Sequence, residues 1–253
     1  MTPTSNPILP GAEPFSADGG PAGVLVVHGF TGSPQSMRGL AEAFAAAGFT
    51  VELPLLPGHG TAVEDMIPCR WDDWSSAAEL AYQELASRCD KVVVAGLSMG
   101  GTLTCWLAAH HPEIAGIVCV NPAVEPPAPE FMDIFQGSLD QGLEIIPAIG
   151  NDVADPDSTE LAYDATPVAA GQSLFKAIAD LEPELSEIRC PVLLMTSPQD
   201  HVVPPTNSDL LASRVSGPVE RVSLDRSYHV ATIDYDKDEI ETRAVEFAHK
   251  VTA

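Results

Sequence analysis

The sequence predicts an α/β protein with a mostly parallel central sheet and helices on both of its faces. Short apolar runs rich in Val, Leu and Ile alternate with segments in which apolar residues recur at helical spacing. Uninterrupted apolar runs are typical of strands buried on both faces, and strands that alternate with helices form parallel sheets. At 253 residues the chain can form one large domain of this class with a small insertion.

The first 122 residues supply the opening strands and helices of this core. Residues 1 to about 21 are rich in Pro and Gly and predict an extended lead-in, with an early edge strand near Ala12–Phe15. Ser33 and Pro34 are typical of an N-cap and the first turn of a helix, and Gly48 can end that helix. The other elements expected here are strands at 24–27, from 49 onward, at 92–94 and at 114–122, and helices at 37–49, 71–89 and 100–111.

Between residues 123 and 181 the alternation of strands and helices stops. This part contains EPPAPEF, an acidic loop and one short helical pattern, GQSLFKAIADL. We expect an inserted cap over the carboxyl edge of the sheet, with residues 1–122 and 182–253 together forming the core. The alternation then resumes with a strand and loop at 189–205, a helix at 207–215, a strand at 219–224 and a terminal helix at 236–251.

The charge of the chain restricts its partners. The 36 acidic and 12 basic residues give a formal net charge of −24 at pH 7. A surface this negative repels phosphate groups, so nucleic acid and anionic lipid are excluded as partners. The charge either serves solubility alone or favours neutral and cationic small molecules as substrates.

Neither the cysteines nor the apolar runs indicate an exported or membrane-spanning protein. The five cysteines are scattered and contain no C-x-x-C pair, which is typical of free thiols in a reducing compartment. The amino terminus lacks a basic start followed by an apolar stretch, and no apolar run is long enough to cross a bilayer. We therefore expect a cytoplasmic protein without an integral membrane segment.

The stretch VVVAGLSMGG, residues 92–101, carries the clearest chemical signal. A short strand is followed by Gly96, Ser98 and Gly100 and then by a helical segment, which is the context of a G-x-S-x-G nucleophile elbow. Small residues are needed on both sides of the serine because side chains there would collide with the neighbouring strand and helix. Ser98 is therefore the predicted nucleophile; the alternative is a Gly-rich turn with a solvent-facing serine.

A serine nucleophile needs a base, and the base needs an acid that orients it. In chains with this elbow the order is Ser, acid, His, with the last two in loops after late strands. Asp200 follows the strand VLLMT and His229 follows the strand VERVSL, so both fall at the sheet edge where the elbow opens. Asp225 is an alternative acid, although its place just before the histidine favours a role in that turn.

The other histidines fit structural positions better than catalytic ones. His201 is adjacent to the predicted acid, so its side chain should diverge from that carboxylate. His28 and His59 lie beside glycines in loops after strands and are expected to be packed and hydrogen-bonded. His110 and His111 end a helix, where a partial positive charge suits the dipole. Because no two of these have the spacing of a zinc site, we predict no metal and no cofactor.

Acyl transfer also requires hydrogen-bond donors for the oxyanion of its transition state. One donor is expected from the backbone N–H of Met99, directly after the nucleophile at the start of its helix. The other is expected from the backbone N–H of Phe30, where Gly29 and Gly32 let the loop after the first buried strand approach closely. The alternative for this loop is a plain glycine turn.

Four stretches of the chain together resemble a known family. In order they are HGFTGSPQSMRGLAEAFAAAGFTVELPLLPGHG, GLSMGGTL, QDHVVPP and SYHVATIDYD. They resemble the bacterial monoacylglycerol lipases of the α/β-hydrolase superfamily, and the likeness covers nearly all of the chain after about residue 22. The first twenty residues and the start of the insertion, from Glu125 to about Glu144, match nothing recognised.

The resemblance implies an α/β-hydrolase fold and a serine hydrolase that releases one fatty acyl chain from a glycerol monoester. It also implies that the cap forms an apolar tunnel for the acyl chain. Glu160, in STELAYDATP, matches a glutamate that contacts the glycerol hydroxyls, and Ile149, in AIGND, matches a position that lines the glycerol end. Without the resemblance, Glu160 would be one more acid in an acidic loop.

Two alternatives to a monoacylglycerol lipase stay open at this point. The same side chains serve general carboxylesterases and other triad hydrolases, including enzymes that cleave amides or thioesters. A small-molecule receptor with a retained triad and negligible turnover is the second alternative.

Overall fold

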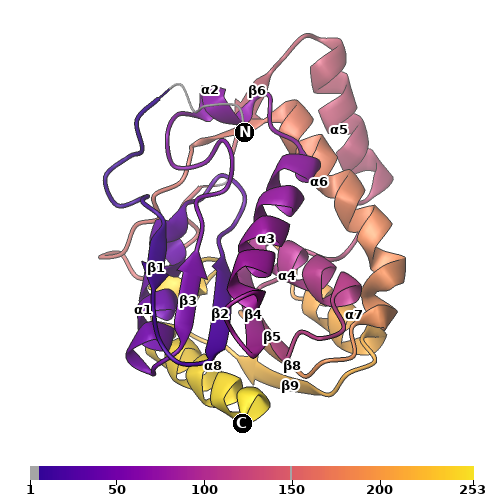
Figure 1. Cartoon of the computed structure of the whole chain (residues 1–253). Coiled ribbons are helices and arrows are strands. Elements are labelled where there is room, and N and C mark those ends of the chain that lie inside the picture. Colours follow the sequence, from indigo (N-terminus) through magenta and orange to yellow (C-terminus); the bar gives the residue numbers. More distant parts are fainter. Residues whose placement is uncertain (1–5, 149) are drawn as a thin grey trace.

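The computed structural model describes residues 6–148 and 150–253 and has a seven-stranded sheet at its centre (Figure 1). The strand order is β1-β3-β2-β4-β5-β8-β9. All neighbours are parallel except β1, which runs antiparallel to β3. The strands are β1 Phe15–Ala17, β2 Ala22–Val27, β3 Thr50–Leu53, β4 Lys91–Leu97, β5 Gly116–Val120, β8 Val192–Thr196 and β9 Val219–Ser223.

Helices cover both faces of this sheet, as the predicted α/β class requires. On one face pack α1 Arg38–Ala46 and α8 Lys237–Thr252. On the other pack α3 Trp71–Ala86, α4 Met99–His110 and α7 Thr206–Arg214. The short helical segments are η1 Pro34–Met37, α2 Val63–Met66, η2 Glu182–Glu187 and η3 Ala231–Ile233.

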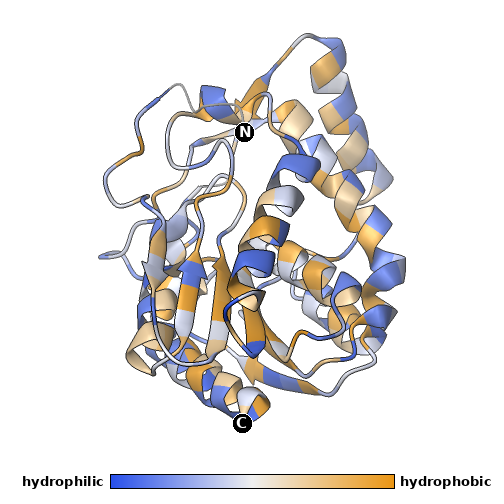
Figure 2. Ribbon diagram, in the orientation of Figure 1, coloured by the Kyte–Doolittle hydropathy of each residue, from blue (hydrophilic) through white to orange (hydrophobic). Residues whose placement is uncertain are grey.

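The central strands are apolar because both of their faces are buried. In β4, Val92 and Val94 point into the core shared with α3 and α4, whereas Val93 and Ala95 point into the core shared with α1 and α8. Figure 2 shows hydrophobic colour along the central strands and hydrophilic colour on the outer sides of the helices. Burial on both faces explains the uninterrupted apolar runs in the sequence.

In the amino-terminal part, the predicted position of the edge strand is wrong, whereas the predicted N-cap at Ser33 is confirmed in position but not in its bonding. The edge strand covers Phe15–Ala17 instead of Ala12–Phe15, because Pro14 has no N–H to donate and the ladder with β3 starts after it. Ser33 occupies the N-cap position of η1, but its side chain makes no capping bond. Its hydroxyl instead donates to the carbonyl of Leu161 at 2.9 Å, which ties this turn to the inserted segment.

The segment between β5 and β8 contains more regular structure than the sequence predicts. It comprises α5 Pro129–Asp140, the antiparallel pair β6 Ile145–Pro147 and β7 Ala165–Pro167, and α6 Val168–Leu181. The predicted short helix is the second part of α6, while α5 and the β6–β7 pair were not anticipated. The prolines of EPPAPEF suggest a loop, yet Pro129 is at the start of α5, where a missing N–H is tolerated. In Figure 1, α5 lies beyond one end of the sheet and beside α6, which continues down past α3 and α4.

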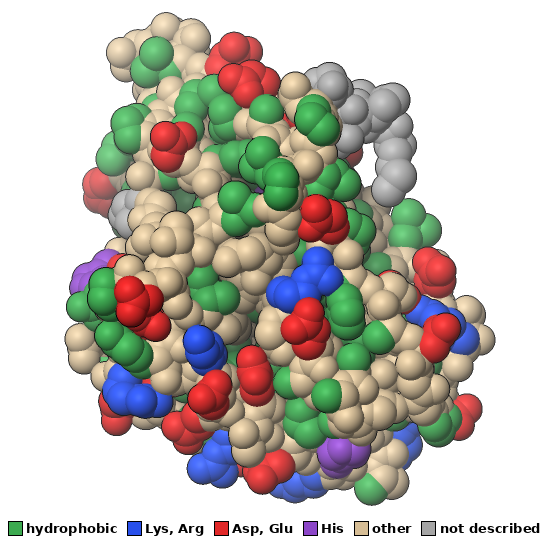
Figure 3. All heavy atoms as spheres, turned by 90° about the vertical axis from the view of Figure 1, so that its left-hand side faces the viewer, with side chains coloured by type: hydrophobic (Ala, Val, Ile, Leu, Met, Phe, Trp, Pro, Cys, Tyr) green, Lys and Arg blue, Asp and Glu red, His purple; other side chains and the backbone are tan. Residues whose placement is uncertain are grey.

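The surface reflects the excess of acids over bases. On the face shown in Figure 3, acidic side chains are scattered from top to bottom and do not gather in one region. Among the described helices, none has both the length and the apolarity that a membrane crossing requires.

Candidate active site

Ser98 lies in a strained turn between β4 and α4. Its backbone has φ 57° and ψ −119°, a conformation that few residues with side chains adopt. A Cβ atom on Gly96 would lie 2.1 Å from the carbonyl oxygen of Gly100, and one on Gly100 would lie 2.1 Å from that of Val27. Only glycine fits at these two positions, so the G-x-S-x-G pattern is a packing requirement of the turn.

Asp200 and His229 meet at the carboxyl edge of the sheet, as their positions after β8 and β9 predict. Asp200 Oδ2 and His229 Nδ1 are 2.7 Å apart, and the side chain of Asp200 is 1% exposed. Asp200 Oδ1 accepts the N–H groups of Val202 at 2.8 Å and Val203 at 2.7 Å. These donors fix the carboxylate, which in turn orients the imidazole with Nδ1 toward the acid and Nε2 free to act as a base.

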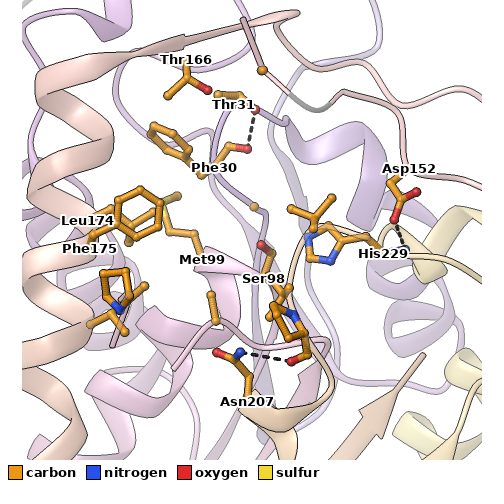
Figure 4. A pocket seen from close by; sticks show the side chains of 18 of the residues that line it. Phe30, Thr31, Ser98, Met99, Asp152, Thr166, Leu174, Phe175, Asn207 and His229 are labelled. Atoms are coloured by element: carbon orange, nitrogen blue, oxygen red, sulfur yellow. Dashed lines mark hydrogen bonds between the residues drawn. The ribbon is translucent and has the colours of Figure 1, made fainter. Parts of the chain in front are cut away.

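Ser98 and His229 line one cavity of about 950 Å³. Figure 4 shows the ring of His229 turned toward the hydroxyl of Ser98, with Met99 and Phe30 on the other side of the serine. The alternative acid, Asp225, is exposed and accepts a hydrogen bond from Ser223, so the structure pairs His229 with Asp200 instead.

His28 supports the loop that carries Phe30. Its Nδ1 donates to the carbonyl of Gly29 at 3.0 Å, and its Nε2 accepts the N–H of Leu56 at 3.2 Å. The Gly29 carbonyl and the Phe30 N–H belong to one peptide plane and point in opposite directions. The bond from His28 therefore fixes the direction of the Phe30 N–H. Burial lowers the pKa of His28 to about 4, so the ring is neutral at pH 7.

The other histidines have structural partners. His59 is buried against the rings of His28 and Trp74, and burial holds its pKa well below the usual value. His111 directly follows α4, and its Nε2 lies 2.8 Å from a carboxylate oxygen of Glu79 in α3. His201 does diverge from its neighbour Asp200, and its Nδ1 lies 2.8 Å from Asp152 Oδ1.

The far side of the cavity is apolar. Phe131 and Phe135 of α5 and Phe175 of α6 pack with ring centroids 5.1–5.3 Å apart, and Leu174 and Ile178 lie beside them in the lining. This wall consists entirely of side chains from the inserted segment. It gives the cavity one polar end at Ser98 and one end suited to a hydrocarbon.

Glu160 also lines the cavity, close to the loop of Phe30. Its carboxylate oxygen Oε1 lies 2.8 Å from where a Cβ on Gly32 would be, and its N–H donates to Asn151 Oδ1 at 2.7 Å. Burial raises the pKa of Glu160 to about 6, although the nearby His229 opposes that shift. The carboxylate is not hydrogen-bonded to any other residue in the described part of the chain. Ile149, the other predicted substrate-binding residue of the cap, lies outside the described residues.

Asn121, which the sequence analysis did not single out, joins the loop of His229 to the loop of Asp200. It follows β5 with φ 43°, and its Nδ2 donates to the carbonyl of His229 at 2.8 Å. Its Oδ1 accepts the N–H of Ser197, at the start of the Asp200 loop, at 2.8 Å. The only local signal is an Asn-Pro pair at the carboxyl end of a buried strand, which is also common in ordinary turns.

A mostly parallel sheet with a serine turn after one strand, and an acid and a histidine after later strands, defines an α/β hydrolase. Residues 21–236 match the family model described as serine aminopeptidase, S33, and the chain belongs to this family.

Individual relatives are also similar over nearly their whole length. The chain is 50% identical over 245 residues to a thermostable monoacylglycerol lipase of Bacillus sp. (strain H-257), covering 96% of this chain and 97% of the relative. It is 26% identical over 241 residues to a carboxylesterase of Bacillus subtilis (strain 168), covering 94% of this chain and 97% of that relative. A solved structure from work on LipS and LipT, two metagenome-derived lipolytic enzymes, has 43% identity and a TM-score of 0.92, covering 96% of this chain and 100% of that one. The resemblance seen in the four sequence stretches is thus confirmed.

Proposed function

We propose that this protein, a carboxylic ester hydrolase, cleaves monoacylglycerols to glycerol and a free fatty acid. One observation carries the proposal: a single cavity combines Ser98, an aromatic wall from α5 and α6, and the half-buried carboxylate of Glu160. A long acyl chain needs the wall, and a small polar alcohol needs the carboxylate. The 50% identity to a monoacylglycerol lipase supports the same substrate.

In the proposed reaction, Ser98 attacks the ester carbonyl while His229 removes its proton. Asp200, 2.7 Å from His229 Nδ1, holds the ring in place and stabilises the imidazolium. The N–H groups of Phe30 and Met99 donate to the oxyanion. His229 then gives its proton to the leaving glycerol oxygen, and an acyl-enzyme forms. Water, deprotonated by His229, repeats the sequence and releases the fatty acid.

The two ends of the substrate would lie at opposite ends of the cavity. We assign the acyl chain to the wall of Phe131, Phe135 and Phe175 and treat residues 123–181 as a cap over the site. We assign the glycerol to the side of Glu160, whose carboxylate is available to accept bonds from the two free hydroxyls. The proposal that Ile149 lines the glycerol end of the site rests on the family resemblance. A cytoplasmic location remains the expectation from the sequence.

Hydrolysis of monoacylglycerols of graded chain length, alongside the matching di- and triacylglycerols, tests the proposal. We expect turnover of the mono-esters and little of the others, because the cavity has one apolar wall for an acyl chain, whereas Glu160 lines its other side. Equal rates on triacylglycerols, or no turnover of monoacylglycerols where p-nitrophenyl esters are cleaved, would contradict it.

Amide cleavage is the second candidate, and the family description as serine aminopeptidase favours it. The same triad can attack an amide, so aryl amides belong in the substrate panel. A receptor with negligible turnover would instead show stoichiometric labelling of Ser98 by a fluorophosphonate with no measurable hydrolysis of any substrate in the panel.

A further inference from the structure

Asp152, a residue of the inserted segment, is bonded to both of the loops that carry the proposed acid and base. Its Oδ2 accepts the backbone N–H of His229 at 3.1 Å (dashed line in Figure 4) and the backbone N–H of His201 at 3.1 Å. Its Oδ1 lies 2.8 Å from the ring Nδ1 of His201. One carboxylate, 10% exposed, thus connects the histidine loop to the residue directly after Asp200.

The contacts around Asp152 form a crossed arrangement. His229 of one loop is bonded through its ring to Asp200 of the other, while His201, next to Asp200, is bonded through its ring to Asp152. The ring of His201 also packs edge-on against Tyr228, the neighbour of His229, with centroids 4.6 Å apart. The two loops follow different strands, and these contacts lock their relative position.

The backbone beside Asp152 is held to the same loop at further points. The carbonyl of Asp152 accepts the N–H of Val230 at 3.1 Å. The buried carboxylate of Asp234 accepts the N–H of Ala154 at 2.7 Å and that of Tyr228 at 2.9 Å. Residues 152–154 are therefore bonded along the loop that carries His229. A movement of this part of the inserted segment away from that loop would also displace His229.

We propose that Asp152 is a positioning residue for the triad: it fixes the histidine loop against the acid loop, so that the insertion completes the catalytic machinery as well as covering it. The inference rests on the proposed function of Ser98, Asp200 and His229. A displacement of about 1 Å between reacting groups can lower a rate by about a hundredfold. A carboxylate that spans both loops is placed to prevent such a displacement.

Three variants test the proposal on a short p-nitrophenyl ester, whose acyl chain does not reach the far wall and whose leaving group has no free hydroxyls for Glu160 to bind. Asp152→Ala removes all three bonds. Asp152→Asn can keep them, because its amide oxygen can accept both backbone N–H groups and its amide N–H can donate to a neutral His201. Asp157→Ala, an exposed aspartate in the same loop whose side chain has no bonding partner among the described residues, controls for the loss of one negative charge.

We expect Asp152→Ala to lower kcat by about a hundredfold with KM within about twofold, and Asp152→Asn to recover most of the loss. The low-field proton resonance of the bond between His229 and Asp200 should broaden or disappear in the alanine variant and persist in the asparagine variant. A fall in kcat of less than tenfold relative to Asp157→Ala overturns the proposal. So does an asparagine variant that recovers less than half of the loss on a logarithmic scale.

A substitute variant and a second measurement cover a failure of Asp152→Ala to fold and a wrong substrate assignment. If Asp152→Ala does not fold, Asp152→Ser, whose short hydroxyl reaches at most one of the two loops, is held to the same tenfold criterion. The rate of Ser98 labelling by a fluorophosphonate should fall in parallel with kcat, and it can be measured whether or not monoacylglycerols are substrates. A wrong substrate assignment therefore leaves this test intact, whereas a protein whose Ser98 is never labelled contradicts the proposed triad itself.

Discussion

The Ser98 turn and the Glu160 corner face the same cavity, but the chain holds them in different ways. The Ser98 turn is fixed by exclusion: the backbones of β2, β4 and α4 approach so closely that a methyl group at Gly96 or Gly100 would overlap a carbonyl oxygen. The Glu160 corner is fixed by a few bonds from polar side chains, such as Asn151 Oδ1 to the N–H of Glu160 and Ser33 Oγ to the carbonyl of Leu161.

Under the proposed function, this difference separates the part of the site that performs the chemistry from the part that selects the alcohol. Close backbone packing leaves no freedom to the nucleophile, which suits a step that tolerates little displacement. Polar side chains on a loop can be exchanged without disturbing the sheet, which suits a region that recognises the alcohol. The expected effects of substitution follow from this contrast, and they decrease from the Ser98 turn to the Glu160 corner.

Replacing the nucleophile should have the largest effect. Ser98→Ala removes the attacking oxygen, and we expect kcat for a p-nitrophenyl ester to fall by on the order of a millionfold. Residual rate above water would come from the oxyanion donors and binding alone. Ser76→Ala on the exposed side of α3 should leave kcat unchanged. Retention of more than about 1% of the activity in Ser98→Ala would show that another group is the nucleophile.

Replacing a glycine of the Ser98 turn should have the next largest effect. A Cβ in Gly100→Ala would lie 2.1 Å from the carbonyl oxygen of Val27, so a backbone must move. We expect unfolding to become easier by about 3 kcal/mol and kcat/KM to fall by about a hundredfold.

Gly137→Ala is the matched control for the glycine prediction. Gly137 lies in α5 of the inserted segment, and a Cβ there would meet no atom within 4 Å. Alanine loses less backbone entropy than glycine when the helix forms, so this variant should be more stable by about 0.5–1 kcal/mol. Urea unfolding of both variants compares the two regions directly, and equal effects would remove the contrast between them.

The same contrast explains what the sequence could and could not reveal. Steric exclusion selects glycine at fixed spacing around Ser98, and strand order places Asp200 and His229 at the same edge, so these residues can be found from the sequence alone. Asp152, Asn121 and Asp234 make bonds to distant backbone. Nothing in the local sequence marks Asp152 or Asp234, and the Asn-Pro pair at Asn121 is also common in ordinary turns. The sequence did not predict helix α5, because the prolines before it and at its start are compatible with both a loop and the first turn of a helix.

His28 allows the proposed oxyanion role of the Phe30 loop to be tested without changing a backbone donor. His28→Leu removes the bond to the Gly29 carbonyl and leaves the buried N–H of Leu56 without a partner. The Phe30 N–H then loses its fixed direction, and we expect kcat to fall by ten- to a hundredfold, approaching the effect of about 2.7–4 kcal/mol for a lost oxyanion donor. KM should change little, because the donor acts mainly on the transition state.

A rate comparison with His110→Leu, a substitution at a half-exposed histidine at the end of α4, controls for the loss of an imidazole. Trifluoromethyl ketones that mimic the tetrahedral intermediate should bind more weakly to His28→Leu by about the same factor as kcat falls. Unchanged inhibitor binding would place the role of His28 in folding alone.

Glu160→Gln should have the smallest effect on rate, and it should stabilise the protein where Gly100→Ala destabilises it. The pKa of this carboxyl is raised to about 6 by burial, so the unfolded chain releases the proton at lower pH than the folded protein does. Folding therefore becomes less favourable as the pH rises from about 4.5 to 6, and the full penalty, about 2 kcal/mol, is present above that range. Glutamine removes the charge, so Glu160→Gln should be more stable than the unmodified protein at pH 8 and equally stable at pH 4.

The same substitution should raise KM for a monoacylglycerol severalfold, because a carboxylate accepts stronger bonds from the glycerol hydroxyls than an amide oxygen does. KM for the methyl ester of the same fatty acid, which has no hydroxyls, should not change. Glu144→Gln, at an exposed position of the inserted segment, serves as the control for charge. A gain in stability without any change in the ratio of the two KM values would mean that Glu160 is only a buried acid, and the glycerol would have to be placed elsewhere in the cavity.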